Sequence, residues 1–127
     1  FKPSNIHAGG LRYHGAGMIV SQLIKDKMMH GVDIPQLESF ESGMLFARTE
    51  GIIPAPESCH AIAATIREAK KCKETGEQKV ILFCLSGHGL IDMPSYEQFI
   101  SGDLQNYTVS DEEIERNVSE LEPIIKE

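Results

Sequence analysis

Long hydrophobic runs, paired cysteines and a leader sequence are all missing from this chain. No apolar stretch reaches the roughly 18 to 20 residues that cross a bilayer, and the start shows no charged segment followed by an apolar run. The three cysteines are an odd number without C-x-x-C spacing, which argues against a disulfide framework and a zinc knuckle. These absences predict a soluble, cytoplasmic protein with no membrane partner. The start at Phe1 instead of Met suggests a piece of a longer chain.

Basic residues are too few and too clustered for nucleic-acid binding. The formal net charge is −7, and residues 111–127 alone hold seven acidic and two basic side chains, which gives −5. The one basic cluster is Lys70, Lys71 and Lys73. It falls at the expected C-terminal end of a helix, where the helix dipole favours cations, so a solvated helix end explains it. Binding to a phosphate backbone needs a basic face, and no nucleic-acid partner is therefore expected.

Apolar periodicity and glycine stops predict four or five helices in one domain of 127 residues. The expected helices are 18–30, 39–50, 57–75 and two short ones that begin at the capping boxes Ser95-x-x-Gln98 and Ser110-x-x-Glu113. Gly31, Gly51 and Gly76 are the expected stops. The side chains expected to face inward are Ile19, Leu23, Ile24, Leu37, Phe40, Met44, Ala47, Ile62, Ile66, Ala69, Ile114, Val118 and Leu121.

Strand signals are scarce. Residues 79–85 form the best strand candidate, and residues 32–37 form a weaker one interrupted by Pro35. A helix followed by a strand is half of a right-handed crossover unit, so the predicted fold class is α/β. Since a mean sheet has about 5 to 6 strands, the chain is expected to contribute to a sheet whose other strands come from upstream sequence or a partner chain. Such an incomplete sheet exposes an edge and predicts a homo-oligomer.

Ser86 follows the candidate strand directly and precedes two glycines, which is how a buried strand meets a ligand crevice. Three interpretations compete. A serine nucleophile is disfavoured, because Cys84 stands where a nucleophile elbow needs glycine. The other two are a hydrogen-bond partner for a ring nitrogen or phosphate, and a serine that merely caps a turn. The Gly87-His88-Gly89 turn itself matches neither dinucleotide nor P-loop patterns.

Glu50 stands where a helix is expected to meet a buried turn formed by Gly51 and the apolar Ile52 and Ile53, so it is either a capping partner or an acid of a site. Cys84 lies inside the apolar run and is interpreted as a small core residue. Cys59 beside His60 suggests a nucleophile with its base, but neighbours on a helix point in different directions, so this pairing is disfavoured. The five histidines show no i, i+4 pair, and no metal site is expected.

Two segments carry a family resemblance. Arg48-Thr-Glu-Gly-Ile-Ile-Pro-Ala-Pro-Glu-Ser-Cys-His-Ala-Ile-Ala64 and Lys79-Val-Ile-Leu-Phe-Cys-Leu-Ser-Gly-His-Gly89 closely resemble the C-terminal part of tryptophan synthase β chains. His7-Ala-Gly-Gly-Leu-Arg-Tyr-His-Gly15 is similar to the second, longer class of that family. The resemblance implies a pyridoxal-phosphate (PLP) enzyme of fold type II, of which residues 1–127 would be a partial, incomplete three-layer αβα domain with residues 103–127 as an acidic C-terminal extension.

The resemblance also implies roles. Ser86 would meet the pyridine nitrogen of the cofactor, with Gly87 beside it, and Gly10 would let its loop approach the cofactor closely. Glu50 would handle protons near the ring. The family joins indole to serine with release of water, and the cofactor performs the difficult electronic work. Arg12 replaces an aspartate of the first class and would favour an anionic group on the substrate, so both serine and phosphoserine are candidate donors.

The resemblance sets limits as well. The family's Schiff-base lysine and glycine-rich phosphate loop lie upstream of the matching region, so the chain alone is expected to be inactive. The acidic extension has no counterpart in the first class, which argues against pairing with the usual α subunit. A non-catalytic binding or assembly module that keeps the fold is the alternative function.

Overall fold

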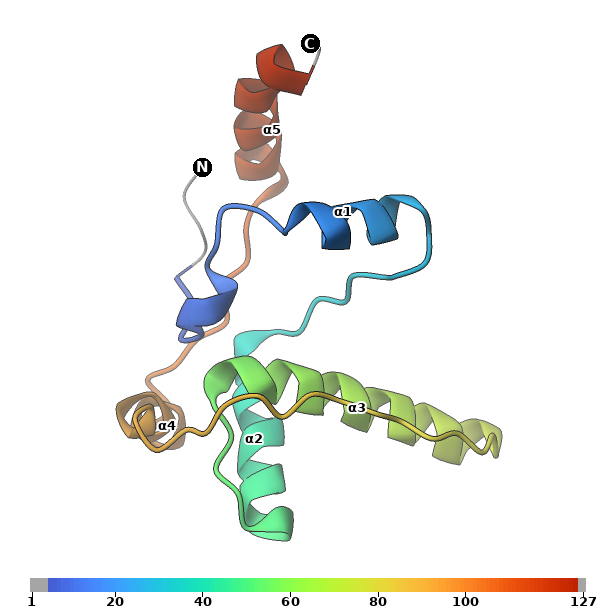
Figure 1. Ribbon diagram of the computed structural model, residues 1–127. Helices are drawn as coiled ribbons and strands as arrows, with labels where there is room; N and C mark the ends of the chain where they lie inside the picture. The colour runs from blue at the N-terminus through green and yellow to red at the C-terminus, as the bar shows by residue number, and fades with distance from the viewer. Residues whose placement is uncertain (1–4, 126–127) are drawn as a thin grey trace.

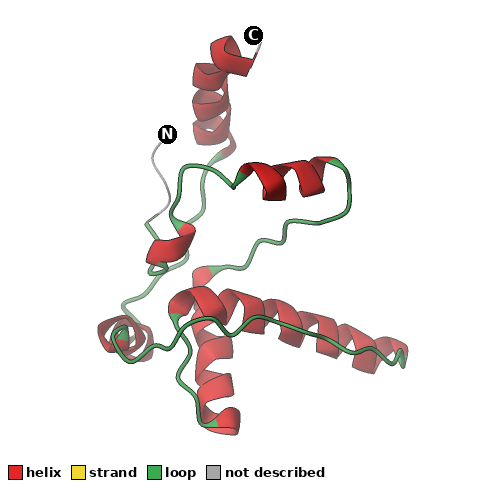
Figure 2. Cartoon of the chain, in the orientation of Figure 1, coloured by secondary structure: helices red, strands yellow, loops and turns green. Residues whose placement is uncertain are grey.

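The computed structural model describes residues 5–125, with side chains as far as residue 119. This part of the chain is helical (Figures 1 and 2). Its elements are η1 Gly9–Leu11, α1 Met18–Lys25, α2 Gln36–Glu50, α3 Pro56–Thr75, α4 Met93–Ser101 and α5 Asp111–Ile125. None of these helices is both long enough and apolar enough to cross a membrane.

The α2–α3 pair is the centre of the fold, and its helix ends follow the sequence closely. Pro56 opens α3, where a missing amide hydrogen costs nothing. Gly51 and Gly76 end the two helices in the left-handed region, each at φ 73°. Both predicted stops are confirmed, because glycine alone adopts this conformation without a steric penalty.

Other helix boundaries differ from those predicted, because distant residues satisfy the helix ends. The second helix begins at Gln36, not at Ser39, since the amide of Leu37 donates to Asn106 Oδ1 at 2.9 Å. Gln36 itself donates through Nε2 to the Gln105 carbonyl at 2.7 Å. The first helix stops at Lys25 instead of His30. Its end is closed by Lys27, a non-glycine residue at φ 59°.

The two predicted capping boxes have different outcomes. Ser110 Oγ accepts a hydrogen bond from the Glu113 amide at 3.2 Å, which confirms the start of α5. The box at Ser95 is wrong, because α4 begins earlier, at Met93. Ser95 Oγ instead lies 3.1 Å from His7 Nδ1, a partner 88 residues away in the sequence.

Neither predicted strand forms in the described part of the chain. The only pairing outside helices there is an isolated antiparallel bridge between Pro54 and His88. A strand exists only through hydrogen bonds to a neighbour, and none of the described segments lies beside residues 79–85 in that way. The described chain is therefore helical, and the few strands of the predicted α/β class are not observed.

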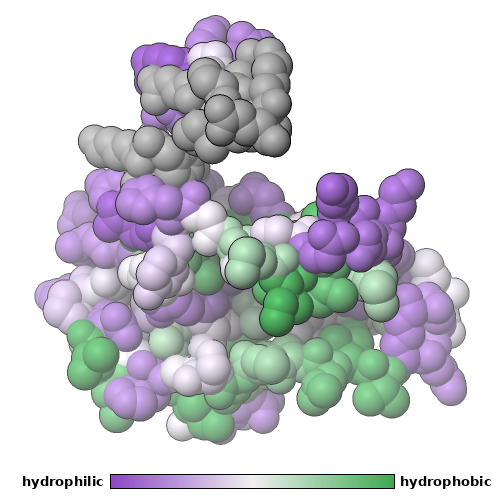
Figure 3. Space-filling view, turned by 45° about the horizontal axis from the view of Figure 1, so that its top comes forward, coloured by the Kyte–Doolittle hydropathy of each residue, from purple (hydrophilic) through white to green (hydrophobic). Residues whose placement is uncertain are grey.

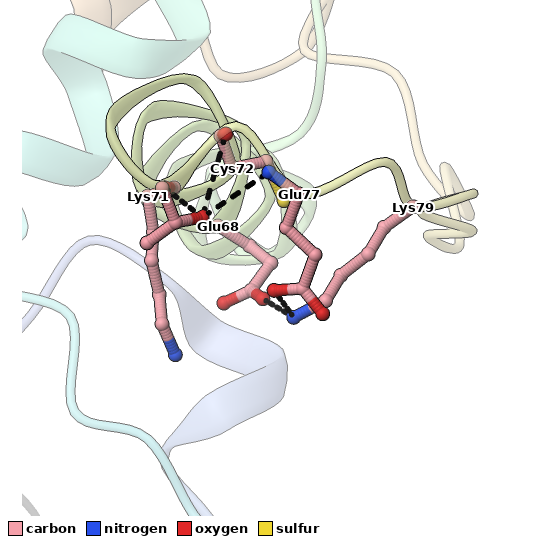
Figure 4. A network of polar contacts seen from close by, with 6 residues as sticks. Glu68, Lys71, Cys72, Glu77 and Lys79 are labelled. Atoms are coloured by element: carbon pink, nitrogen blue, oxygen red, sulfur yellow. Dashed lines mark hydrogen bonds and ion pairs between the residues drawn. The ribbon is translucent and has the colours of Figure 1, made fainter.

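Residues 79–85 instead run back along α3 (Figure 1). Lys79 Nζ lies between the carboxylates of Glu68 and Glu77, at 2.8 and 3.0 Å (Figure 4). Farther along, the ring of Phe83 meets that of Phe46 edge to face at 5.9 Å. The alternate side chains face outward, with Val80 fully exposed and Leu82 93% exposed.

The core lies where α2, α4 and the start of α3 meet. Its buried members are Phe40, Cys59, Tyr96 and Leu104, and the half-buried side chains around them are Leu37, Met44, Ile53 and Phe99. Phe40 meets Tyr96 edge to face at 5.1 Å and stacks on Phe99 at 5.7 Å. The inward positions predicted for α2 are thus largely confirmed, and Ile62 of α3 is buried as well.

Several other predicted core positions are exposed. They are Ile19, Ile24, Ala69, Ile114 and Val118. For the positions on α1 and α5 the reason is the arrangement of the helices, because neither of these two helices packs against another helix in the described part. Leu121 lies outside the described side chains. The space-filling view accordingly shows hydrophobic residues on the surface (Figure 3).

Candidate functional site

The N-terminal end of α3 gathers the segments that the sequence singled out. The amide of Ala55 donates to the Gly87 carbonyl at 3.0 Å, and the amide of Gly89 donates to the Ile53 carbonyl at 2.8 Å. These two bonds flank the Pro54–His88 bridge. Together they fix the turn that follows Ser86 against the start of α3.

The two glycines of this turn are required by close packing. A Cβ at Gly89 would lie 2.4 Å from the Pro54 carbonyl oxygen, and one at Gly87 would lie 2.9 Å from Ala55 Cβ. Real Cβ atoms do not approach other heavy atoms that closely, so any side chain here would push the turn away from α3. The Gly-His-Gly pattern therefore has a structural cause that the sequence alone does not reveal.

Ser86 lies at the exposed edge of this turn. Its hydroxyl makes no hydrogen bond to any other described residue, so it does not cap the turn and is available to a ligand. Ser58, in the first turn of α3, has a buried hydroxyl that also lacks a partner within the described chain. It lies 3.9 Å from the position of a Cβ on Gly87. Two serine hydroxyls therefore flank Gly87 without partners, and sequence reasoning had identified only one of them.

Gly10 is anchored at the same helix end. Its amide donates to Glu57 Oε1 at 2.7 Å, and a Cβ on Gly10 would lie 3.2 Å from Glu57 Cγ. A carboxylate in the first turn of a helix is favoured by the helix dipole, which explains why Glu57 stands there. Sequence reasoning did not identify Glu57. An acidic residue directly after the Pro-Ala-Pro start of a helix was the available signal.

Arg12 directly follows η1, two residues beyond the Gly10 anchor. Its side chain is exposed, and its guanidinium has no hydrogen-bond or ion-pair partner among residues 5–119. The contact between Gly10 and Glu57 therefore places the Arg12 guanidinium, unpartnered among residues 5–119, on a loop that is anchored to α3.

Glu50 is the last residue of α2 and is exposed. The expectation of a buried turn around it is wrong for this chain, because the neighbouring Ile52 is 45% exposed too. Glu50 borders a mostly apolar pocket of about 280 Å³ that Phe83 also lines. No hydrogen bond joins Glu50 to Ser86 in the described chain, and Ser86 does not line this pocket.

The pairing of Cys59 with His60 is excluded. Cys59 Sγ is fully buried and lies 3.2 Å from the Tyr96 hydroxyl. His60 Nδ1 instead faces Ser39 Oγ at 3.1 Å and the Pro56 carbonyl at 2.9 Å. Burial raises the pKa of the Cys59 thiol, which keeps it neutral and unreactive. The sequence placed Cys84 in the core instead, and this prediction is wrong, because Cys84 lies on the exposed segment before Ser86.

A search of the described residues finds no group of three or more histidine, cysteine or acidic side chains that could hold a metal ion.

Comparison with known proteins bears directly on this site. No family model matches the chain. It is 58% identical over 104 residues to tryptophan synthase beta chain 2 of Aquifex aeolicus, a match that covers 82% of this chain and 24% of the relative. The protein of the same name from Methanothermobacter thermautotrophicus is 48% identical over 104 residues, with the same coverage. The Thermotoga maritima protein is 56% identical over 96 residues, which cover 76% of this chain and 23% of the relative.

The chain is homologous to part of the tryptophan synthase beta chain. It spans about a quarter of the length of these curated relatives. The resemblance inferred from the motifs is therefore confirmed, and the name beta chain 2 agrees with the second class to which the His7–Gly15 tract pointed.

Proposed function

We propose that these residues are the C-terminal part of a PLP-dependent tryptophan synthase beta chain and form one side of its active site. In the complete protein, residues 79–85 would become a strand of a sheet in a three-layer αβα domain of fold type II. The sequence similarity to beta chains supports this proposal. So does the alternation along residues 79–85, where apolar side chains occupy both faces as they do in buried parallel strands.

The residues present fit one edge of the cofactor. The Ser86 hydroxyl is exposed and unpartnered, so it can bond a pyridine nitrogen, and glycine at position 87 leaves room beside it. When bound, PLP supplies the electron sink for replacing the hydroxyl of serine by indole. A serine partner, unlike an aspartate, keeps the ring nitrogen unprotonated, and this favours elimination and replacement at the β carbon.

The described chain holds no suitable Schiff-base lysine at this site. Such a lysine must lose its proton to react. Lys79 is the lysine nearest in sequence to Ser86. Its ammonium group donates hydrogen bonds to Glu68, which has the larger effect, and to Glu77, and these bonds raise the pKa of Lys79 and keep it charged. The lysine and the phosphate-binding loop would come from the remaining three quarters of the complete protein.

Two further residues would act on the substrates, indole and serine or phosphoserine. Arg12 would bind an anionic group of the amino-acid donor, because its guanidinium is exposed and unpartnered in the described chain. Glu50 would hold or move a proton near the cofactor ring. Its carboxylate lies at the rim of the pocket beneath residues 79–85, which is open to groups from the rest of the complete protein.

The observation that carries the proposal is the free hydroxyl of Ser86, held at the start of α3 in a sequence homologous to beta chains. The test is a chimera in which these 127 residues replace the matching part of the Thermotoga maritima protein. In it, Ser86→Ala and Glu50→Gln are each expected to lower tryptophan formation roughly tenfold or more, the effect of losing one hydrogen bond and leaving its partner unsatisfied. Ser86→Ala should also shift the absorbance of the bound cofactor.

Matched substitutions control this test. Ser119→Ala on α5 and Glu41→Gln on the exposed side of α2 make the same chemical changes away from the site, and both should leave rate and absorbance unchanged. If Ser86→Ala and Glu50→Gln also change neither, the site assignment fails and a binding or assembly module becomes the better account. Turnover by the purified 127-residue chain alone would contradict the claim that it is inactive by itself.

A further inference from the structure

Tyr96 joins α4 to the paired segments beside Ser86. Its side chain is 2% exposed, and its hydroxyl donates to the Pro54 carbonyl at 2.6 Å. The Cys59 thiol lies 3.2 Å from the Tyr96 hydroxyl oxygen and donates to it. Burial raises the pKa of both groups, so both stay protonated. The donor roles follow from geometry, because the Pro54 carbonyl can only accept and takes the single hydrogen of the Tyr96 hydroxyl. A single buried hydroxyl thus connects α4, α3 and the segment before α3.

The carbonyl that Tyr96 binds belongs to the central residue of the bridge. Pro54 has no amide hydrogen, and the two hydrogen bonds of the pairing are made by its neighbours Ile53 and Ala55. The Tyr96 bond is therefore the one that fixes the Pro54 carbonyl itself.

Gly89 is held from the same side. A Cβ on Gly89 would lie 3.0 Å from Tyr96 Cε2, so the tyrosine ring covers the backbone of the turn. The Gly89 carbonyl also accepts from the Asp92 amide at 2.9 Å, directly before α4. Tyr96 thus contacts both segments that the bridge joins, Pro54 with its hydroxyl and Gly89, next to His88, with its ring.

We propose that Tyr96 is a positioning residue for Ser86. By clamping Pro54 and Gly89 together, it holds the turn after Ser86 against α3 and so sets where the Ser86 hydroxyl points. The clamp itself follows from the contacts of the described chain, whereas its catalytic value rests on the proposed function of Ser86.

Amide hydrogen exchange in the 127-residue chain, followed by NMR, tests the clamp. Tyr96→Phe keeps the ring and its contact with Phe40 but removes the hydroxyl. The Ala55 and Gly89 amides, which make the pairing, are then expected to exchange about tenfold faster relative to Ile66 and Arg67 in the middle of α3, on the scale of one buried hydrogen bond.

Two control variants separate this effect from general loosening. Tyr107→Phe makes the same chemical change at a tyrosine that is 44% exposed, and Cys59→Ala removes the other hydrogen bond to the Tyr96 hydroxyl without touching Pro54. Both should leave Ala55 and Gly89 unchanged relative to α3. An equal acceleration at all four amides in Tyr96→Phe, or the same local acceleration in Cys59→Ala, would overturn the clamp. If Tyr96→Phe does not fold, hydrogen exchange in the unmodified chain provides the test. Ala55 and Gly89 amides that show no protection from exchange there would also overturn the clamp.

The chimera separates this proposal from the proposed function. Tyr96→Phe is expected to move the absorbance of bound PLP in the same direction as Ser86→Ala, and by less. If Ser86→Ala shifts the spectrum but Tyr96→Phe does not, the positioning role is wrong. If Ser86→Ala itself shifts nothing, the proposed function fails, while the exchange result still decides whether the clamp exists.

Discussion

Gly43 shows how closely the core is packed at a single residue. It lies in the middle of α2, where a Cβ would stand 2.4 Å from Cys59 Sγ and 3.0 Å from the Tyr96 hydroxyl. Cys59 is fully buried and held by Tyr96, so the sulfur has no space to move into. The absence of a side chain at position 43 is therefore what lets α2 approach α3.

Gly43→Ala should accordingly destabilise the chain. Alanine favours helix, but the overpacked methyl group is expected to cost about 1 to 3 kcal/mol of unfolding free energy. Urea unfolding followed by circular dichroism measures this. Gly31→Ala is the control, because a Cβ there meets nothing within 4 Å. Equal stability of the two variants would show that α2 and α3 are farther apart than described.

The ion pair of Glu38 with Arg67 predicts a pH dependence. Hydrogen bonds from Arg67, one of them at 2.6 Å, lower the pKa of Glu38 from its ordinary 4.5. A carboxyl with a lower pKa in the folded state stabilises the fold above its ordinary pKa, and this contribution is lost as the pH falls through the folded-state value. The pair joins α2 to α3 at their exposed side.

Glu38→Gln is therefore expected to reduce stability at neutral pH by about 0.2 to 1 kcal/mol, the range for exposed pairs. The difference from the unmodified chain should shrink as the pH falls below 4.5 and then through the lower folded-state pKa, because Glu38 is protonated in both states below both values. Urea midpoints across this range provide the measurement. Glu41→Gln, on an exposed part of the same helix, should show no such trend. A constant difference at all pH values would contradict the assigned pair.

At the scale of the element, residues 79–85 have two different faces. Phe83 packs on Phe46 and lines the pocket with Ile62 and Ile66, while Leu82 points outward. This alternation is the period of a β-strand. The segment thus keeps the side-chain pattern of a strand although it has no neighbour to pair with.

Adjacent substitutions test the two faces. Phe83→Ala is expected to lower the unfolding free energy by about 1 to 2 kcal/mol, since it removes an edge-to-face contact and part of a buried ring. Leu82→Ala should change it by less than about 0.5 kcal/mol, because that side chain is already in solvent. Urea unfolding of both variants decides the matter, and equal effects would show that the segment does not lie along α3 with this face inward.

For the whole molecule, the balance of buried and exposed apolar groups predicts self-association. Val80 and Leu82 lie on a segment with unpaired backbone groups, and other large apolar side chains are exposed as well: Met18 at 90%, Ile19 at 79% and Ile91 at 82%. Exposed strand-like edges and apolar patches recruit other chains.

We expect the isolated chain to form dimers or larger assemblies, as measured by light scattering over a range of concentrations. The double substitution Val80→Lys with Leu82→Lys should reduce association, because lysine on a strand edge disfavours pairing. Ile100→Lys, at a 69% exposed position on α4, is the control and should have less effect. A monomer at high concentration would contradict the argument that a covering sheet is missing.

Helix ends set by local backbone chemistry could be predicted from the sequence. Pro56, Gly51 and Gly76 define the limits of α2 and α3 through the restricted φ of proline and the left-handed conformation of glycine, which depend on no distant residue. The motif around Ser86 likewise located a turn with a free hydroxyl. For the helix ends the deciding interactions lie within a few residues, whereas the turn is held by Ile53 and Ala55, more than about 30 residues away in the sequence.

Tertiary structure decided everything that needs a partner far along the chain. Residues 79–85 have the composition of a strand but form none, because strand formation requires a neighbouring ladder. Glu57, Ser58 and Tyr96 gain their importance from contacts with residues 29 to 47 positions away. The amphipathic α5 leaves Ile114 and Val118 exposed for the same reason. Periodicity tells which side of a helix is apolar, but only the packing of the folded chain determines whether anything covers it.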